Sequence, residues 1–211
     1  TGLQLRPGQL YAYDMRLDIE APVDAGDSGT AAVGLDALGL LSGDAALGYV
    51  PGLLPTFRAP TEAANALEFI HASCRKLHGP GKDAMPHLDE VLKGLRTDEF
   101  KRPQMLSLTG DQIYADDVAG PLLPVLTAVG HALLGWDQPE RLPYPSGNFT
   151  LDTVLPGLRT EVAKVARLTS GEAACHLLGL GEFYAMYLMA WCDAVWPSSL
   201  PDSTQIYPPE V

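Results

Sequence analysis

The sequence predicts an α/β protein, because short apolar strands alternate with helical patterns in the central part of the chain. The apolar run at 67–74 precedes a helical pattern at 83–95, and the run at 104–110 precedes another at about 116–135. Strands that alternate with helices in this order are typical of a parallel sheet. With 46% hydrophobic and 19% charged residues, the composition is that of a globular chain.

The first 60 residues differ from the rest of the chain. Residues 9–20 alternate apolar and polar side chains as a half-buried strand does, whereas 21–60 are rich in Gly, Ala, Asp and Pro. A single strand is not a stable sheet. We therefore expect residues 1–60 to be the C-terminal part of an N-terminal β module whose earlier strands precede the chain, and residues 61–211 to be the first part of a second domain.

The second region opens with a strand at 67–74, which runs into Ser73-Cys74-Arg75-Lys76 and a turn rich in Gly and Pro. Asp83 is placed to cap the helix that follows, and Gly94 weakens the end of that helix. The apolar face of this helix is formed by Met85, Leu88, Leu92 and Leu95.

Potential ligands are densest at residues 104–117. The apolar run at 105–108 predicts a short strand, buried if helices cover it, that ends at Gly110-Asp111. Ligands collect at the carboxyl ends of strands in open α/β sheets. The Asp111 carboxylate and the Tyr114 phenol can reach one point there, which suits a metal ion that binds phosphate oxygens. Equally, Asp111 could cap a following helix while Tyr114 packs.

The last third of the chain begins with a loop at 137–157 that contains an N-x-[ST] pattern at Asn148, a weak indication of glycosylation. A basic and apolar helix is expected at 159–168. The capping-box sequence at 169–172 then predicts the start of a long segment that reaches Trp196.

Residues 173–192 are apolar on almost every side. His176 and Glu182 within this segment favour a buried helix of a large domain over a membrane span. Cys175 and Cys192 are interpreted as core residues of the same segment.

Charge and motif content exclude several classes of protein. The net charge is −12 and no basic run exceeds Arg75-Lys76 or Lys101-Arg102, which argues against a general nucleic-acid or anionic-membrane surface. Walker-type and G-x-G-x-x-G loops are absent, which argues against a nucleotide cofactor. Three cysteines cannot all pair, so at least one is free or metal-bound. The chain opens without a secretory signal; since a signal could precede Thr1, a cytoplasmic and an exported location both stay open.

Three segments resemble the PhoD-like (alkaline phosphatase D) metallophosphatases. The resemblance spans about residues 55–197, and the Gly-Asp-x-x-Tyr sequence with an upstream Ser-Cys is a fairly specific combination. The segments are His71–Gly81 together with Asp83, Leu108–Val118 and His176–Trp191.

The resemblance implies that Cys74, Asp111 and Tyr114 are metal ligands, with Asp111 bridging a ferric ion and a divalent ion such as calcium. The implied fold is a two-sheet α/β/β/α sandwich behind an N-terminal β-sandwich. The implied activity is hydrolysis of phosphoric esters, as a phosphomonoesterase or phosphodiesterase. Three anionic donors offset the charge of a strongly acidic cation, and two ions about 3.5 to 4 Å apart can hold a phosphate and ready a hydroxide.

The chain departs from the family pattern after residue 135, where His176 is the only histidine. The family's later Asp-Asp-His-Glu-like element and its histidine-bearing C-terminal ligand loops have no counterpart. We therefore expect the chain to be the front part of a larger enzyme, with little activity unless another segment of the same protein completes the site.

Other polar residues allow more than one reading. Arg75 could steady a phosphate oxygen or form a surface ion pair, and Asp116 and Asp117 could support the ligands or cap a helix. A thiol phosphatase of the Cys-x5-Arg type would need arginine where Pro80 stands. The alternative function is a non-catalytic β plus α/β module that binds a protein partner and keeps remnants of the metal site.

Overall fold

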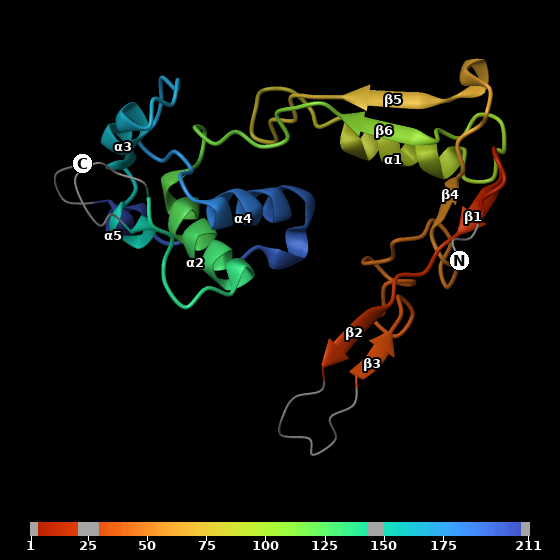
Figure 1. Cartoon of the computed structure of the whole chain (residues 1–211), viewed down its shortest axis with the longest axis horizontal. Coiled ribbons are helices and arrows are strands. Elements are labelled where there is room, and N and C mark those ends of the chain that lie inside the picture. Colours follow the sequence, from red (N-terminus) through yellow and green to blue (C-terminus); the bar gives the residue numbers. More distant parts are fainter. Residues whose placement is uncertain (1–3, 21–29, 143–149, 208–211) are drawn as a thin grey trace. The chain divides into compact units, whose positions relative to one another are not determined.

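The computed structural model describes residues 4–20, 30–142 and 150–207, and the chain forms two compact units (Figure 1). The first unit contains Thr1–Ala72 and Asp83–Thr109, and the second contains Ser73–Lys82 and Gly110–Val211. Helices occur together with small sheets, as the predicted α/β class requires. The assignment of residues 1–60 and 61–211 to two modules of a longer protein stays a prediction.

The first unit begins with two small antiparallel sheets. The predicted strand at 9–20 is interrupted at residues 13–16, because the Asp14 carboxylate accepts a hydrogen bond from the Leu35 backbone N–H (3.0 Å). The two halves then pair with different partners. The sheets are β1 (Leu10–Ala12) with β4 (Thr56–Arg58), and β2 (Leu17–Glu20) with β3 (Thr30–Val33).

A parallel strand–helix–strand unit completes the first unit, as predicted. β5 (Phe69–Ala72) and β6 (Met105–Leu108) pair in parallel, and α1 (Met85–Gly94) connects them and runs alongside them in Figure 1. The Asp83 side chain accepts a hydrogen bond from the Met85 N–H (3.1 Å), and α1 ends at Gly94. Both helix boundaries therefore follow from local sequence.

Two buried arginines bind backbone carbonyls within the first unit. Arg58 donates to the carbonyl oxygens of Gly8 (3.2 Å) and Phe100 (2.9 Å). Arg102 donates to the Thr56 hydroxyl (2.6 Å) and to the Arg96 carbonyl (2.8 Å). These bonds join β4 to the segment between α1 and β6, so the β1–β4 sheet is tied to the strand–helix–strand unit.

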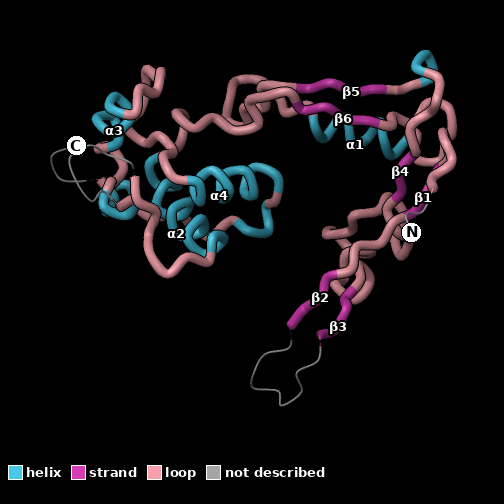
Figure 2. Tube along the Cα trace, viewed as in Figure 1, coloured by secondary structure: helices cyan, strands magenta, loops and turns pink. Residues whose placement is uncertain are grey.

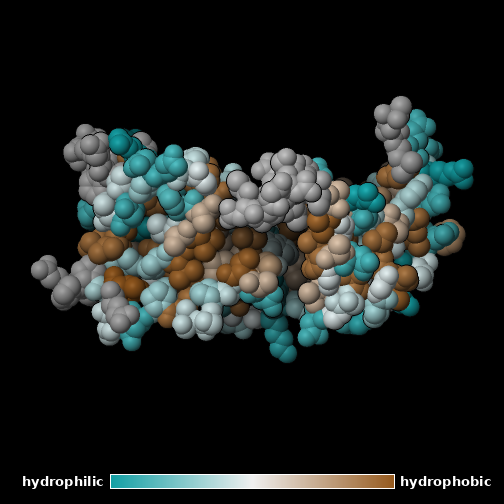
Figure 3. Space-filling view, turned by 90° about the horizontal axis from the view of Figure 1, so that it is seen from below, coloured by the Kyte–Doolittle hydropathy of each residue, from teal (hydrophilic) through white to brown (hydrophobic). Residues whose placement is uncertain are grey.

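The strand predicted at 105–108 forms as β6, but its side chains are largely exposed. Met105 is 48% exposed and Leu106 is 45% exposed, because no third strand flanks β5 and β6 among the described residues. Apolar side chains are visible at the surface in Figure 3, and Phe100 is the most exposed of the large apolar residues described, at 80%.

The second unit is built on two helices that pack against each other, α2 (Leu123–Leu134) and α4 (Leu180–Trp191). Their backbones meet closely at Gly130 and Gly181, where a side chain on either residue would overlap with the other helix. The buried residues of this core are Val118, Leu122, Leu123, Leu126, Cys175, Leu177, Ala185 and Met189.

Several helix boundaries in the second unit differ from those predicted. A 3-10 turn at Gly120–Leu122 leads into α2, so the helix expected from residue 116 starts later. Pro121 and Pro124 lie in the first turns, where the missing backbone N–H costs least. α3 spans Arg159–Val165, and α5 spans Ser203–Ile206.

The sequence 169–172 does not start a helix, because the segment between α3 and α4 is loop (Figure 2). α4 begins only at Leu180, where the Glu182 carboxylate accepts hydrogen bonds from the N–H groups of Leu178 (3.0 Å) and Gly179 (3.4 Å). No helix in the described ranges is long and apolar enough to cross a membrane. The pattern at Asn148 lies outside the described residues.

A fully buried ion pair connects α3 to α4. The guanidinium of Arg159 donates to both carboxylate oxygens of Glu182, at 2.7 and 2.8 Å, and the two residues are 1% and 0% exposed. Arg159 also donates to the carbonyl oxygens of Val154 (3.1 Å) and His176 (2.9 Å), while the Thr127 hydroxyl of α2 donates to Glu182 (2.6 Å). Three helices thus meet at one satisfied polar cluster.

Candidate metal centre

The residues that follow β5 and β6 in the chain stay hydrogen-bonded to each other. The Cys74 N–H donates to the Gly110 carbonyl (3.1 Å), and the Arg75 N–H donates to the Asp111 carbonyl (2.8 Å). This backbone pairing brings the side chains of Cys74 and Asp111 together, with Sγ 3.5 Å from Oδ2. Two predicted ligands that are 37 residues apart in sequence therefore meet.

Cys74 and Asp111 both have left-handed backbones, with φ angles of 56° and 50°. Only one other non-glycine residue of the described ranges, Arg167, has a positive φ. A left-handed conformation costs an ordinary L residue roughly 1–2 kcal/mol, although Asp tolerates it better. Such strain gathers at functional sites, so its presence at two adjacent predicted ligands supports a functional role.

The phenol of Tyr114 lies beside the same two side chains. Its pKa is raised, first because of partial burial, and then because of the negative charges of Cys74 and Asp111 and a hydrogen bond with the Cys74 thiol. Lys76 acts in the opposite direction, with Nζ 5.6 Å from the centre of the Tyr114 ring. All three predicted ligands therefore converge.

This donor set fits a metal ion. A sulfur and an oxygen 3.5 Å apart can bind one ion, since metal–sulfur bonds are about 2.3 Å and metal–oxygen bonds about 2.0–2.2 Å. Cys74 is exposed and free, so its thiol is accessible. Among the described residues no group of three or more His, Cys, Asp or Glu side chains gathers at one place. The phenol of Tyr114 would thus be the third donor, and the described residues would supply only part of a coordination shell.

Arg75 is held by the C-terminal end of α4. Its guanidinium donates to the Ala190 carbonyl (2.8 Å) and lies 4.2 Å from the centre of the Trp191 ring. A cation is favourable at a helix C-terminus, where carbonyl groups lack helical partners. These contacts anchor the segment that carries Cys74 to α4, a role that the sequence does not reveal.

Asp116 and Asp117 support the loop that carries Asp111 and Tyr114. Asp116 accepts a hydrogen bond from the Ser170 hydroxyl (2.9 Å). Neither aspartate caps a helix, because the next helical turn of the described chain begins at Gly120 and has no side-chain cap. For the same reason Asp111 is not a helix cap.

Asp117 forms an ion pair with Lys76 and accepts a hydrogen bond from the ring of His78 (3.1 Å). The hydrogen bond from Lys76, and then that from His78, lower the pKa of Asp117, and the Asp117 partner raises the pKa of Lys76. This cluster ties the segment after Cys74 to the loop after Asp111. The sequence does not reveal this cluster, since no local spacing pairs residues 76 and 78 with residue 117.

A pocket of about 440 Å³ borders these residues. Tyr114, Lys76 and His78 contribute to its polar side, and Met186 and Trp196 to its apolar side. Comparison with known protein families, curated proteins and solved structures finds no match for this chain. The functional interpretation therefore depends on the residues and their geometry.

Proposed function

We propose that the chain supplies the first ligands of a bimetallic phosphoric ester hydrolase of the PhoD-like kind, acting on phosphomonoesters or phosphodiesters. The observation that carries this proposal is the convergence of Cys74, Asp111 and Tyr114, with strained backbones at the first two. The parallel β5–α1–β6 unit would belong to one sheet of the two-sheet α/β/β/α sandwich, and the preceding strands to the N-terminal β-sandwich.

The proposed ions are a ferric ion and a divalent ion such as calcium, held in part by the thiolate, carboxylate and phenolate of this chain. They would supply Lewis-acid activation of the ester and of water. The ion cluster of Lys76, His78 and Asp117 would keep the ligand segments in register, while Arg75 anchors them to α4. The remaining ligands would come from another segment of the same protein.

A non-catalytic partner-binding module is the second candidate. The observation that favours it is the exposure of apolar residues on β6, where Met105 and Leu106 are nearly half exposed. Such a module needs no metal ion. A measurement of iron binding by the predicted ligands therefore distinguishes between the two candidate functions.

The test is the iron content and visible colour of purified protein loaded with ferric ion. Phenolate bound to ferric iron absorbs visible light by charge transfer, so we expect a coloured protein. Tyr114→Phe should bleach the colour, and Cys74→Ser should lower the bound iron because a serine hydroxyl is a poor anionic donor. Both variants should melt close to the wild-type temperature, since Cys74 is exposed.

Two matched variants control for nonspecific effects. Tyr184→Phe changes an exposed tyrosine of α4 and should keep the colour. Cys175→Ser changes a buried cysteine and should cost roughly 1–3 kcal/mol of stability with iron content unchanged. If the loaded protein is colourless, or if Cys74→Ser binds as much iron as wild type, the proposed ligand set is wrong.

A further inference from the structure

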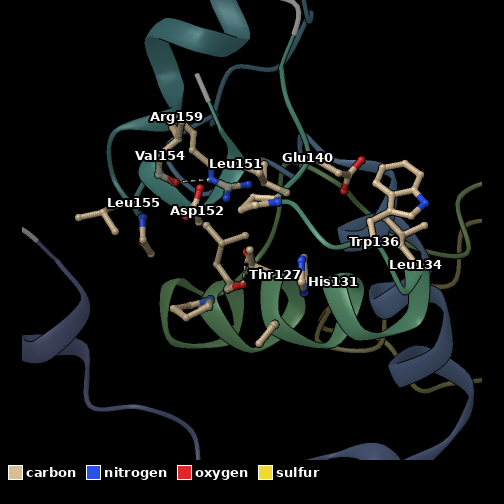
Figure 4. Close-up of a pocket in the computed structure, with 15 residues that line it drawn as sticks. Thr127, His131, Leu134, Trp136, Glu140, Leu151, Asp152, Val154, Leu155 and Arg159 are labelled. Carbon is tan, nitrogen blue, oxygen red and sulfur yellow. Dashed lines mark hydrogen bonds between the residues drawn. The ribbon is translucent and has the colours of Figure 1, made fainter. Parts of the chain in front are cut away.

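A second pocket lies in the second unit between α2 and the loop segments that follow it (Figure 4). Its volume is about 460 Å³, within the range of about 300–1,000 Å³ that small-molecule sites span. None of the proposed metal ligands lines it. The pocket is therefore a separate site, and its interpretation does not depend on the proposed hydrolase.

Most of the pocket wall is apolar. Leu123, Pro124 and Ala128 of α2 face the chain segment that includes Leu151 and Leu155. Such a wall favours a ligand with an apolar or aromatic body, because burying apolar surface releases water. It does not by itself specify the polar group of the ligand.

The charged side chains of the pocket leave an excess of negative charge. Arg159 is the cation of the lining, and its guanidinium is already paired with the buried Glu182. The carboxylates of Asp152 and Glu140 form no ion pair with any described residue. An anionic ligand would face two carboxylates and no available arginine, whereas a cation would meet two carboxylates that have no cationic side chain as a partner among the described residues.

Glu140 is fixed in place. Its two carboxylate oxygens accept hydrogen bonds from the N–H groups of Leu180 (2.7 Å) and Gly181 (2.8 Å) at the start of α4. These bonds hold the carboxylate at the N-terminus of α4. Its position is set before any ligand arrives, which reduces the entropy lost on binding.

An aromatic side chain accompanies this carboxylate. Figure 4 shows Trp136 beside Glu140 at one end of the pocket, and Asp152 toward the other end near Arg159 and Val154. Trp136 is 48% exposed, so its indole ring is accessible. The face of an indole ring attracts cations.

We propose that this pocket binds a small organic cation, an ammonium group carried on an apolar or aromatic body. The ammonium group lies at Glu140 and Trp136, and the body lies along the apolar residues of α2 toward Asp152. His131, which also lines the pocket, offers a ring nitrogen as a further acceptor. The hydroxyl of Thr127 is engaged with Glu182 (2.6 Å) and does not select the ligand.

Isothermal titration calorimetry of the purified protein with three probes of one shape tests the proposal. We expect 2-phenylethylammonium to bind at least about tenfold more tightly than 2-phenylethanol, and 3-phenylpropionate to bind most weakly, because only the first pairs with the carboxylates. Binding of the ammonium probe should weaken as salt rises. Equal affinity for the alcohol, or no heat at about 10 mM of the ammonium probe, would overturn the proposal.

Two variants connect this binding to the pocket. Asp152→Asn keeps the shape of the side chain and removes one charge, and we expect it to weaken binding about twofold to fivefold, as is typical of an exposed charge. Trp136→Leu should weaken binding through loss of the aromatic face. Asp137→Asn, an exposed change outside the pocket lining, is the matched control and should bind as wild type does. Unchanged affinity in both Asp152→Asn and Trp136→Leu, with all variants folded, would contradict the assignment.

Discussion

The ion pair between Arg159 and Glu182 gives the strongest prediction for stability. Arg159→Met and Glu182→Gln each remove one partner of a pair in which the residues are 1% and 0% exposed. Each change leaves the other charge buried without its counter-ion. Solvent cannot reach either group, so neither variant can recover the lost interaction with water.

The expected magnitude follows from the burial. Removing one partner of a buried pair costs about 3–5 kcal/mol, which is a large part of the total stability of a domain. The double variant Arg159→Met/Glu182→Gln carries no buried charge. It still loses about 1–3 kcal/mol of unfolding free energy, because the carbonyls of Val154 and His176 lose their hydrogen-bond donor. The double variant should therefore be more stable than either single variant.

Urea unfolding followed by tryptophan fluorescence measures this directly. All three tryptophans, Trp136, Trp191 and Trp196, lie in the second unit, so the signal reports the unit that contains the ion pair. The control is Glu161→Gln, which removes an exposed pair with Lys164 and should change stability by less than about 1 kcal/mol. A loss below about 1 kcal/mol in both single variants, or a double variant less stable than both, would refute the reasoning.

Two further predictions concern packing and pH. Gly130→Ala should destabilise the second unit by about 1–3 kcal/mol in the fluorescence assay, because the added methyl would overlap with the Gly181 backbone. Gly94 has open space around it at the end of α1, so Gly94→Ala should leave the stability unchanged or raise it by up to about 1 kcal/mol, as measured by thermal melting followed by circular dichroism. A loss of stability at Gly94 equal to that at Gly130 would contradict this. Burial, and then the hydrogen bond to Asp89 (2.8 Å), raise the pKa of Tyr49 from 10.0 to about 12. The protonated phenol therefore stabilises the fold fully below pH 10 and loses this effect as the pH rises toward 12. The difference in unfolding free energy between wild type and Tyr49→Phe should shrink over that interval. A constant difference would show that the phenol proton is not involved.

The parts of the fold that the sequence predicts are those with local causes. The strand–helix–strand unit follows from short apolar runs, and α1 is bounded by Asp83 and Gly94. The interruption of the first predicted strand was missed because Asp14 bonds to Leu35, 21 residues away. The start of α4 was missed because Glu182 is fixed by Arg159, which is 23 residues distant. Long-range polar bonds leave no periodic signal in a sequence.

The same division applies to the candidate centre. The meeting of Cys74 and Asp111 is predictable, because both come just after strands that pair in parallel, and the carboxyl ends of such strands lie together. The contacts that hold them are not predictable. Lys76 meets Asp117 across 41 residues, and Arg75 reaches Ala190 across 115. Only the folded chain shows that Lys76, Asp117 and Arg75 hold the two segments that carry Cys74 and Asp111.

Backbone strain gives the clearest physical reason to regard Cys74 and Asp111 as functional. Glycine would adopt φ angles of 56° and 50° without steric cost, yet both positions carry side chains. Packing does not explain them, since the Cys74 side chain is exposed. A glycine at either position would remove one of the two donors that the left-handed turns bring to 3.5 Å. The strain is offset by the backbone pairing of the two segments and by the ion pair between Lys76 and Asp117. The surrounding structure therefore holds the thiol of Cys74 and the carboxylate of Asp111 next to each other.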